Sequence, residues 1–246
     1  HIVPDSTPDI DLLLFRLKNI INLSNRKVSL LKKQIAKKKS WDTTIVSDNL
    51  TWEEFSKLNL FLHELQGAEP VVSVARFYTD SSSSHAIGYV SEISANDIKS
   101  KTYLQNLNIE GVEIGKTGLE SALDEQMLGS PGYLRYEVNA YGKKIKQVAT
   151  DKGLKGKAFR TTLDQSIQQV STDALQNVSG AVCVMDIYNG DIISMVSAPN
   201  FNPNSFVHGI NRDEWNALIS NKDKPMLNKA VSGLYPPGST IKTLTA

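Results

Sequence analysis

The sequence has 246 residues, of which 40% are hydrophobic and 22% charged, so long disordered tracts and a coiled coil are both excluded. Lysine and arginine number 27 and aspartate and glutamate 26, and a net charge of +1 excludes the strong basic field of a nucleic-acid-binding domain. The one cysteine, Cys183, excludes an internal disulfide and a cysteine-based zinc site. No metal or cofactor is expected, and no apolar run approaches the roughly 18 residues of a membrane-spanning helix.

The two ends of the chain indicate that it is part of a longer protein. The first residue is His1 rather than methionine, and no basic start with an apolar centre marks a signal peptide. The last residues, Ser239 to Ala246, predict a helix that has barely begun. We therefore expect the sequence to be a fragment.

Two helices are predicted in the first forty residues. Apolar residues recur at helical spacing over 10–21, and Val28, Leu31 and Ile35 lie on one face of a second helix over 26–39. The second helix carries basic residues and no acid: Arg26, Lys27, Lys32, Lys33, Lys37, Lys38 and Lys39. Such a helix suits phosphates or a membrane surface, although a solvated helix face is the simpler interpretation because no base-reading aromatic residues interrupt it.

The next segment predicts a helix followed by two strands. Thr51 and Glu54 have the spacing of a capping box, which starts an amphipathic helix that ends near Gly67. Strands are predicted over 71–78 and from His85 to Val90, with the serines 81–84 as a flexible loop between them. His85 is interpreted as structural rather than catalytic, because no serine or aspartate motif accompanies it.

The second half of the chain predicts further helices and a hairpin. A helix is expected over 118–128 between two glycines, then a strand over 133–140. Asp164 is placed to cap a helix through Gln176. Apolar runs over 181–186 and 191–196 flank Asn189-Gly190, which is a strong hairpin signal. A loop over 199–204 and a short helix over 212–219 follow.

One Ser-x-x-Lys pattern has the context of a catalytic site. Residues three apart share a helix face, so a lysine amine can reach the serine hydroxyl and accept its proton. A serine at a helix start also has backbone N–H groups and the helix dipole available to a developing oxyanion. Ser239 and Lys242 follow Pro236-Pro237-Gly238, which forces a turn before the helix. The alternative is a capping serine with a solvent-exposed lysine.

Two other copies of the pattern, Ser24 to Lys27 and Ser29 to Lys32, lie in or beside the lysine-rich helix and are attributed to chance. Serine penicillin-recognising enzymes also carry Ser-Asp-Asn and Lys-Thr-Gly motifs. Both strings occur here, as Ser47 to Asn49 and Lys116 to Gly118, but both precede Ser239 and so have the wrong order. The first is interpreted as a polar lead-in to Thr51 and the second as a turn that feeds a helix.

Longer segments carry a family resemblance. The sequences AVCVMDIYNGDIISMVSAP, FNPNSFVHGI and NKAVSGLYPPGSTIK resemble the start of the transpeptidase domain of class B penicillin-binding proteins. Upstream, LTWEEFSKLNL, RFYTDSSSSHAIGYVSEIS, IGKTGLESALDEQMLGSPG and YEVNAYGKKIKQV resemble the non-catalytic pedestal of the penicillin-binding protein 2 group, the elongation-type enzymes of rod-shaped Gram-negative bacteria. The resemblance covers roughly residues 45–246.

The resemblance implies an α+β fold. A non-catalytic, elongated pedestal of the dimerisation type is expected over residues 1–160, with a head-like part at about 22–83. Residues 161–246 are expected to be the incomplete N-terminal portion of a β-lactamase-like transpeptidase domain, with its first helix, hairpin and serine helix.

The resemblance also implies a function. These proteins cross-link peptidoglycan stem peptides at the periplasmic face of the inner membrane, held by a single N-terminal anchor that this chain lacks. The implied nucleophile is Ser239 and the implied base Lys242, and β-lactams mimic the D-Ala-D-Ala end and acylate the same serine. The implied partners are the glycan polymerase RodA and the scaffold protein MreC.

Two alternatives to an enzyme remain open from the sequence. In the first alternative, the pedestal is a docking module for elongation-complex partners. In the second, the chain is a β-lactam sensor or hydrolase. The family's later active-site motifs belong after the serine helix, beyond Ala246, so the fragment itself is expected to be inactive.

Overall fold

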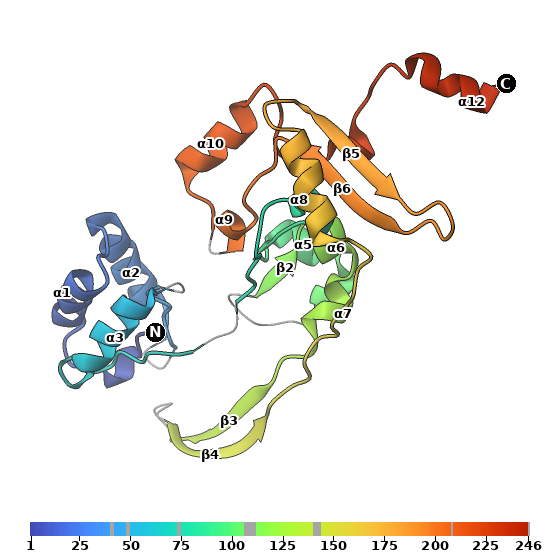
Figure 1. The fold of residues 1–246 in the computed structure, drawn as a ribbon. Coiled ribbons are helices and arrows are strands. Elements are labelled where there is room, and N and C mark those ends of the chain that lie inside the picture. The colour runs from blue at the N-terminus through green and yellow to red at the C-terminus, as the bar shows by residue number, and fades with distance from the viewer. Residues whose placement is uncertain are drawn as a thin grey trace. The chain divides into compact units, whose positions relative to one another are not determined.

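The computed structural model describes residues 1–39, 42–47, 50–72, 75–105, 112–139, 144–207 and 209–245. Helices and antiparallel strand pairs both occur, in agreement with the predicted α+β class (Figure 1). The chain divides into two compact units, and each contains two separate stretches of sequence. The first unit joins His1–Val74 with Gly132–Lys152, and the second joins Ala75–Pro131 with Gly153–Ala246.

The described residues of the first unit form helices and the antiparallel strand pair β3–β4. Its elements are η1 (Pro4–Ser6), α1 (Ile10–Ile20), α2 (Asn25–Lys37), α3 (Trp52–Leu60), η2 (Leu62–Glu64), β3 (Tyr133–Val138) and β4 (Lys144–Asp151). The helices predicted over 10–21 and 26–39 are confirmed. The strand predicted over 133–140 is confirmed up to Val138, and residue 140 lies outside the described residues. Its partner β4 was not predicted.

Side-chain caps explain where the helices of the first unit begin. The Asp9 carboxylate accepts a hydrogen bond from Leu12 N at 2.9 Å, and Ser24 Oγ accepts one from Lys27 N at 3.1 Å. The predicted capping box is present, since Thr51 Oγ1 accepts from Glu54 N and Glu54 accepts from Thr51 N. Each cap satisfies a backbone donor that the helix itself leaves unpaired.

The helix predicted to reach Gly67 ends earlier, at Leu60. The chain tightens into η2, which brings Leu65 into the core with 1% of its surface exposed. Gly67 then takes a φ of +89°, where an added Cβ would lie 1.9 Å from Thr7 Oγ1. Gly67 therefore ends the segment that follows η2 rather than the helix α3.

One apolar core holds the helices of the first unit together. Its buried members come from α1, α2, α3 and the segments around them: Ile2, Leu13, Leu14, Leu17, Ile21, Leu31, Ile35, Val46, Leu58 and Leu65. Isolated bridges from Ile2 to Thr44 and to Ala68 tie the N-terminus to two later segments. Burial of such side chains contributes about 1.5–3 kcal/mol each, so this core is the main stabilising feature of the helical part.

The second unit contains short elements from both of its sequence stretches. From the first come α4 (Ser84–Ile87), β1 (Val90–Glu92), α5 (Ala95–Ser100), η3 (Thr102–Leu104), β2 (Glu113–Gly115), α6 (Gly118–Ala122) and α7 (Asp124–Leu128). From the second come α8 (Gln165–Ala174), β5 (Gly180–Met185), β6 (Ile192–Ala198), α9 (Asn204–Val207), α10 (Arg212–Ser220), α11 (Lys229–Ser232), η4 (Gly238–Ile241) and α12 (Lys242–Thr245).

Several predictions for the second unit are confirmed. Asp164 caps α8 by accepting from Ile167 N at 3.0 Å, and β5 and β6 form the predicted antiparallel hairpin. The short helix predicted over 212–219 is α10. The helix predicted over 118–128 is interrupted at Leu123 into α6 and α7, and Gly129, with a φ of +71°, ends α7.

The two strands predicted between residues 71 and 90 are wrong. Among the described residues of 71–78 there is no strand, and at Tyr78 the side chain of Asn204 makes the backbone hydrogen bonds that a neighbouring strand would make. Its Oδ1 accepts from Tyr78 N at 2.9 Å and its Nδ2 donates to Tyr78 O at 2.8 Å. The predicted strand from His85 to Val90 is instead helix α4, and Gly88, with a φ of +88°, ends that helix before β1 begins at Val90.

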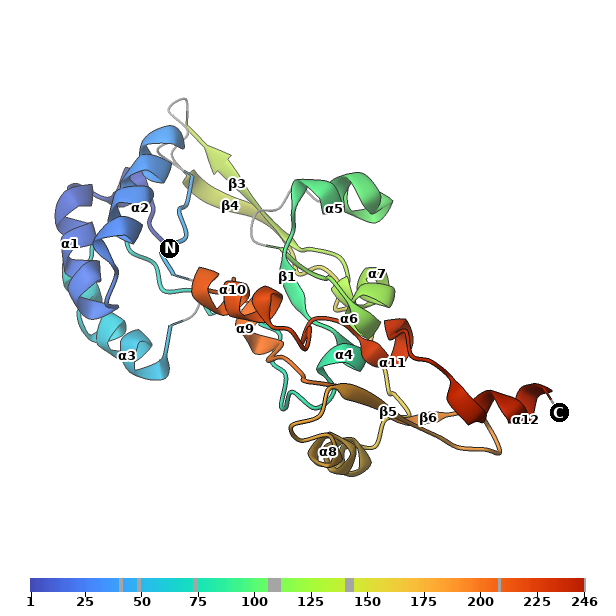
Figure 2. The ribbon, with the colours of Figure 1, turned by 90° about the horizontal axis from the view of Figure 1, so that it is seen from above.

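Residues 81–84, predicted as a flexible loop, form a turn with buried hydroxyls. Ser82 is 5% and Ser84 1% exposed, and the Asp80 carboxylate accepts from Ser82 N at 2.8 Å. Gln168 of α8, fully buried, donates to Ser82 O at 3.0 Å and to Met195 O at 2.8 Å. Helix α8 lies against the β5–β6 hairpin in both views (Figures 1 and 2). One buried amide thus joins the serine turn, α8 and β6.

Candidate functional site

The predicted serine lies in the last described turn of the chain. Gly238 has a φ of +54°, a left-handed conformation that favours glycine, so the predicted turn before the serine is present. Ser239 lies in η4 and Lys242 is the first residue of α12, with Lys242 N donating to Ser239 O. Both side chains are exposed, and within the described residues no hydrogen bond joins Ser239 Oγ to Lys242 Nζ. The two groups are therefore one turn apart but not enclosed.

The segment before this turn is anchored in the second unit. Ser197 Oγ of β6 donates to Leu227 O at 3.0 Å and accepts from Lys229 N at 3.0 Å. The Lys229 side chain is buried, and Nζ donates to Lys224 O at 3.2 Å. Burial lowers the pKa of Lys229, although Asp223 opposes that shift. These contacts fix the chain through α11, seven residues before Ser239.

His85 joins α4 to the same segment. Its Nε2 lies 2.7 Å from Pro225 O, and Asn228 Nδ2 donates to His85 O at 3.3 Å. The ring also meets Phe201 edge to face, with 5.1 Å between centroids. Burial lowers the pKa of His85, and the nearby Lys229 ammonium lowers it further, while the Pro225 carbonyl opposes both. This buried, packed position fits the structural role predicted for His85.

The two other Ser-x-x-Lys copies have structural roles. Ser24 is the N-cap of α2, and its hydroxyl accepts from the backbone N–H of Lys27 rather than from its side chain. In the second copy, Lys32 Nζ forms an ion pair with Asp11 of α1 at 2.6 Å. Among the described residues, no contact joins either lysine side chain to its serine, which agrees with the prediction from the sequence context.

The Lys-Thr-Gly string also has a structural role. Lys116 forms an ion pair with Asp97 of α5, which helps to lower the pKa of that carboxyl to about 2. Gly118 has a φ of +58°, and a Cβ there would lie 2.7 Å from Ala86 O. The string therefore packs the start of α6 against α4. Two residues of the Ser-Asp-Asn string, 48 and 49, lie outside the described residues.

The sequence did not predict two buried carboxylates, those of Glu120 and Asp124. Glu120 is 4% exposed, and its oxygens lie 2.9 Å from Arg76 Nε and 3.0 Å from Arg76 Nη2, while Tyr78 Oη donates to it at 3.2 Å. Asp124 is 5% exposed and accepts from Gly115 N at 2.7 Å. The acid-rich composition of residues 110–142 gave no sign of which acids are buried, since their partners lie up to 44 residues away.

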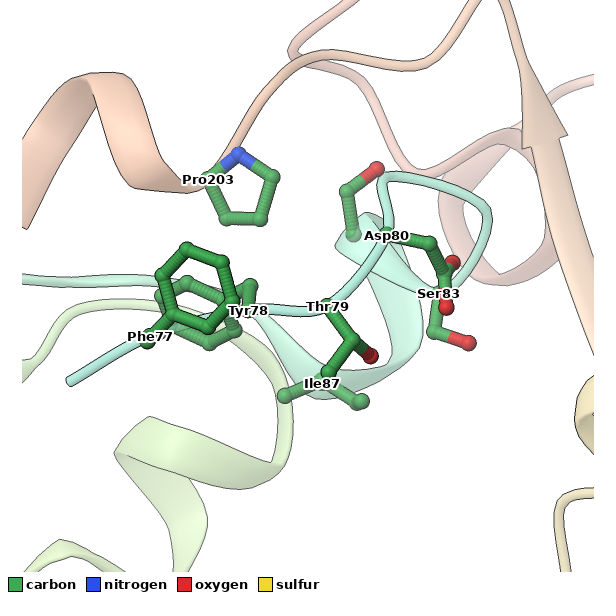
Figure 3. Close-up of a pocket in the computed structure, with 8 residues that line it drawn as sticks. Phe77, Tyr78, Thr79, Asp80, Ser83, Ile87 and Pro203 are labelled. Carbon is green, nitrogen blue, oxygen red and sulfur yellow. The ribbon is translucent and has the colours of Figure 1, made fainter.

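A cavity of about 140 Å³ lies beside α4 (Figure 3). It is lined by Phe77, Tyr78, Thr79, Asp80, Ser83, Ser84, Ile87 and Pro203. Ser84 is one of these lining residues, and its hydroxyl is buried without a hydrogen-bond partner among the described residues. The cavity includes neither Ser239 nor Lys242, so it is separate from the predicted catalytic pair.

Comparison with known protein families defines the class. The sequence model of the penicillin-binding protein dimerisation domain matches residues 1–161, and that of the penicillin-binding protein transpeptidase domain matches residues 180–246. The chain therefore belongs to the penicillin-binding proteins, and it contains a dimerisation domain followed by the first part of a transpeptidase domain. The family predicted from the sequence motifs is confirmed.

Curated relatives point to one branch of that family. The chain is 31% identical over 241 residues to the peptidoglycan D,D-transpeptidase MrdA of Acinetobacter baumannii, covering 97% of this chain and 35% of that protein. It is 29% identical over 255 residues to MrdA of Escherichia coli K12, covering 100% of this chain and 39% of the relative. The chain thus spans between a third and two fifths of the length of these relatives.

Solved structures agree with the sequence relatives. A chain in the complex between the penicillin-binding protein PBP2 and MreC from Helicobacter pylori matches with a TM-score of 0.77 and 27% identity, over 97% of this chain and 45% of that one. Pseudomonas aeruginosa PBP2 in complex with WCK 5153 matches with a TM-score of 0.56 and 30% identity, over 70% of this chain and 34% of that one. The predicted resemblance to the penicillin-binding protein 2 group is confirmed. No helix within the described ranges is long and apolar enough to cross a membrane.

Proposed function

We propose that this chain is part of a peptidoglycan D,D-transpeptidase that cross-links stem peptides during cell elongation. The observation that carries the proposal is the order of parts: a dimerisation domain, then a transpeptidase start that ends in Gly238-Ser239-x-x-Lys242. The MrdA relatives, named as D,D-transpeptidases, support the same activity. Residues 1–160 serve as the pedestal in this proposal, and residues 161–246 begin the catalytic domain.

In the proposed reaction, Ser239 is the nucleophile and Lys242 the general base. Ser239 Oγ attacks the carbonyl carbon of the D-Ala-D-Ala bond, and its proton passes to Lys242 Nζ. The carbon–nitrogen bond then breaks, the terminal D-Ala leaves as an amine that takes up a proton, and an acyl ester remains on the serine. The amine of a neighbouring stem peptide attacks this ester and frees the serine.

The exposure of Ser239 and Lys242 leads us to propose that the 246-residue chain is inactive by itself. Acyl transfer depends on preorganised donors in a site from which water is excluded. Neither side chain is enclosed by the described residues, so a longer protein is required to complete the site.

The proposed partners follow from the relatives. The Helicobacter pylori complex pairs a PBP2 with MreC, which supports MreC as a partner of this pedestal. The glycan polymerase RodA, β-lactams as inhibitors, and the periplasmic face of the inner membrane as the location are proposed on family grounds. A docking module without catalysis is the alternative to this proposal.

Intact mass measured after incubation with penicillin tests the catalytic assignment. The protein extended to its natural C-terminus should gain one penicillin adduct, and Ser239→Ala should gain none. Ser29→Ala is the matched control, because it removes an exposed serine from another Ser-x-x-Lys copy. An adduct that persists in Ser239→Ala refutes the assignment. If the extended protein is folded and forms no adduct, only the docking function remains as an explanation.

A further inference from the structure

Helix α2 carries a row of cations on the side opposite its buried face. At 100° per residue, Arg26, Lys33 and Lys37 fall within about 40° of one another around the helix axis. Ile35, which is 7% exposed, points into the core on the far side. We call Arg26, Lys33 and Lys37 the basic ridge. With a rise of 1.5 Å per residue, it is about 16 Å long.

The described residues do not neutralise the charges of the basic ridge. Within the described residues, no ion pair or hydrogen bond occupies the side chains of Arg26, Lys33 or Lys37. In contrast, Lys32 on the flank of the same helix is paired with Asp11 at 2.6 Å. The segment from Ser24 to Lys39 contains no acid. The ridge is therefore a local cationic surface on a chain whose net charge is only +1.

Exposed apolar side chains accompany the ridge. Leu30 lies beside the ridge on α2 with 48% of its surface exposed, and Phe15 of α1 is 62% exposed. Helices α1 and α2 lie side by side (Figures 1 and 2), joined by the Lys32–Asp11 pair and by Lys18 Nζ, which donates to Asn25 Oδ1 at 2.7 Å. At 100° per residue, Phe15 lies about 40° from Asp11 around the axis of α1, next to the two residues that contact α2.

We propose that the basic ridge, together with Leu30 and Phe15, binds the headgroup layer of an anionic phospholipid bilayer. Guanidinium and ammonium groups pair with lipid phosphates. Cations beside exposed leucine and phenylalanine are the composition of helices that lie in a membrane interface. A soluble polyanion would use the three charges but would gain nothing from the two apolar side chains, so the lipid surface is the occupant that accounts for both.

Vesicle co-sedimentation of the 246-residue chain tests the proposal. Phosphatidylcholine vesicles that contain phosphatidylglycerol should pellet the protein, and vesicles of phosphatidylcholine alone should not. Each lysine near an anionic surface contributes about fivefold in affinity, so Lys33→Gln/Lys37→Gln should bind about 30-fold more weakly. The matched control is Lys155→Gln/Lys157→Gln, which changes the net charge equally at two exposed loop lysines and should bind like the parent.

A Phe15→Ser variant separates a lipid surface from a soluble polyanion. Insertion of the ring predicts about tenfold weaker vesicle binding for this variant. Circular dichroism confirms that each variant keeps its helices. Unchanged binding in Phe15→Ser together with competition by inorganic polyphosphate assigns the ridge to a polyanion and overturns the proposal. Equal binding by the ridge variant and its control, or no binding to phosphatidylglycerol by the folded parent, also overturns it.

Discussion

Replacement of Asp124 by alanine should strongly destabilise the second unit. The carboxylate lies at the start of α7 and is the shared acceptor for three donors. Gly115 N of β2 donates at 2.7 Å, Lys101 Nζ at 3.3 Å, and the hydroxyl of Tyr103 also donates. The bond from Tyr103 is one reason, after burial, for the raised pKa of that phenol.

The expected loss follows from what each donor retains after Asp124→Ala. The buried N–H of Gly115 loses its acceptor, which costs about 1–3 kcal/mol. Lys101 keeps the Gly115 carbonyl at 2.9 Å, and Tyr103 can turn toward water, so each of these loses about 1 kcal/mol. We expect a loss of about 3–5 kcal/mol in the free energy of unfolding, the range for breaking a buried ion pair. Asp124→Asn, which keeps one oxygen, should lose less.

Hydrogen exchange measured by mass spectrometry on peptides from residues 112–128 reports the second unit separately, and urea unfolding gives the overall loss. Exchange should accelerate strongly in Asp124→Ala. The matched control is Glu125→Ala, the exposed neighbour in the same helix, which should stay within about 0.5 kcal/mol of the parent. If Asp124→Ala loses less than about 1 kcal/mol and the peptide stays protected, the assigned network does not stabilise this unit.

Three further predictions concern stability. Gly118→Ala should lower the free energy of unfolding by at least about 2 kcal/mol. The left-handed backbone costs about 1 kcal/mol, and the new Cβ would also lie 2.7 Å from Ala86 O. Gly190→Ala, with a φ of +78° and open space around it, should lose only the backbone cost of about 1 kcal/mol. Buried His85 has a lowered pKa, so its contribution to stability should be complete above the ordinary histidine pKa of 6.5 and be lost below it, because the unfolded chain takes up the proton first. A urea midpoint that does not fall as the pH is lowered below 6.5 contradicts this. Thr51→Ala should cost about 1 kcal/mol, seen as a lower urea midpoint, and an unchanged midpoint would show that the capping box adds nothing.

The sequence predicted best those elements whose signals are local. Helix α2 has a capping serine and an apolar face of its own, and the β5–β6 hairpin has two apolar runs around an Asn-Gly turn. The strand predicted over 71–78 was wrong, and at Tyr78 a distant residue supplies the hydrogen bonds of a neighbouring strand. The backbone N–H and C=O of Tyr78 are hydrogen-bonded by the side-chain amide of Asn204, 126 residues later. No local sequence rule reveals such a partner.

For the candidate site, too, the features with local sequence signals were predictable and those that depend on distant residues were not. The turn before Ser239 was predictable because two prolines and a glycine stop the preceding element, and Gly238 takes the left-handed conformation in the structure. The structural roles of the competing strings were also indicated by their context, and Lys116 and Gly118 fulfil them through contacts to α5 and α4. The anchoring of Lys229 on Ser197 was not predictable, because it depends on the path of the chain between them.

The amide of Gln168 has a consequence for how this chain can be recombined with its relatives. A cut near residue 161, where the dimerisation-domain match ends, passes through a single compact unit and separates Gln168 from Ser82. A hybrid that took residues 1–161 from one protein and the rest from another would have to supply matching partners on both sides of that buried amide. Residues 75–131 and 153–246 form one compact unit and are therefore expected to be exchanged together between relatives. The segment that can be exchanged thus differs from the segments that the two family models match.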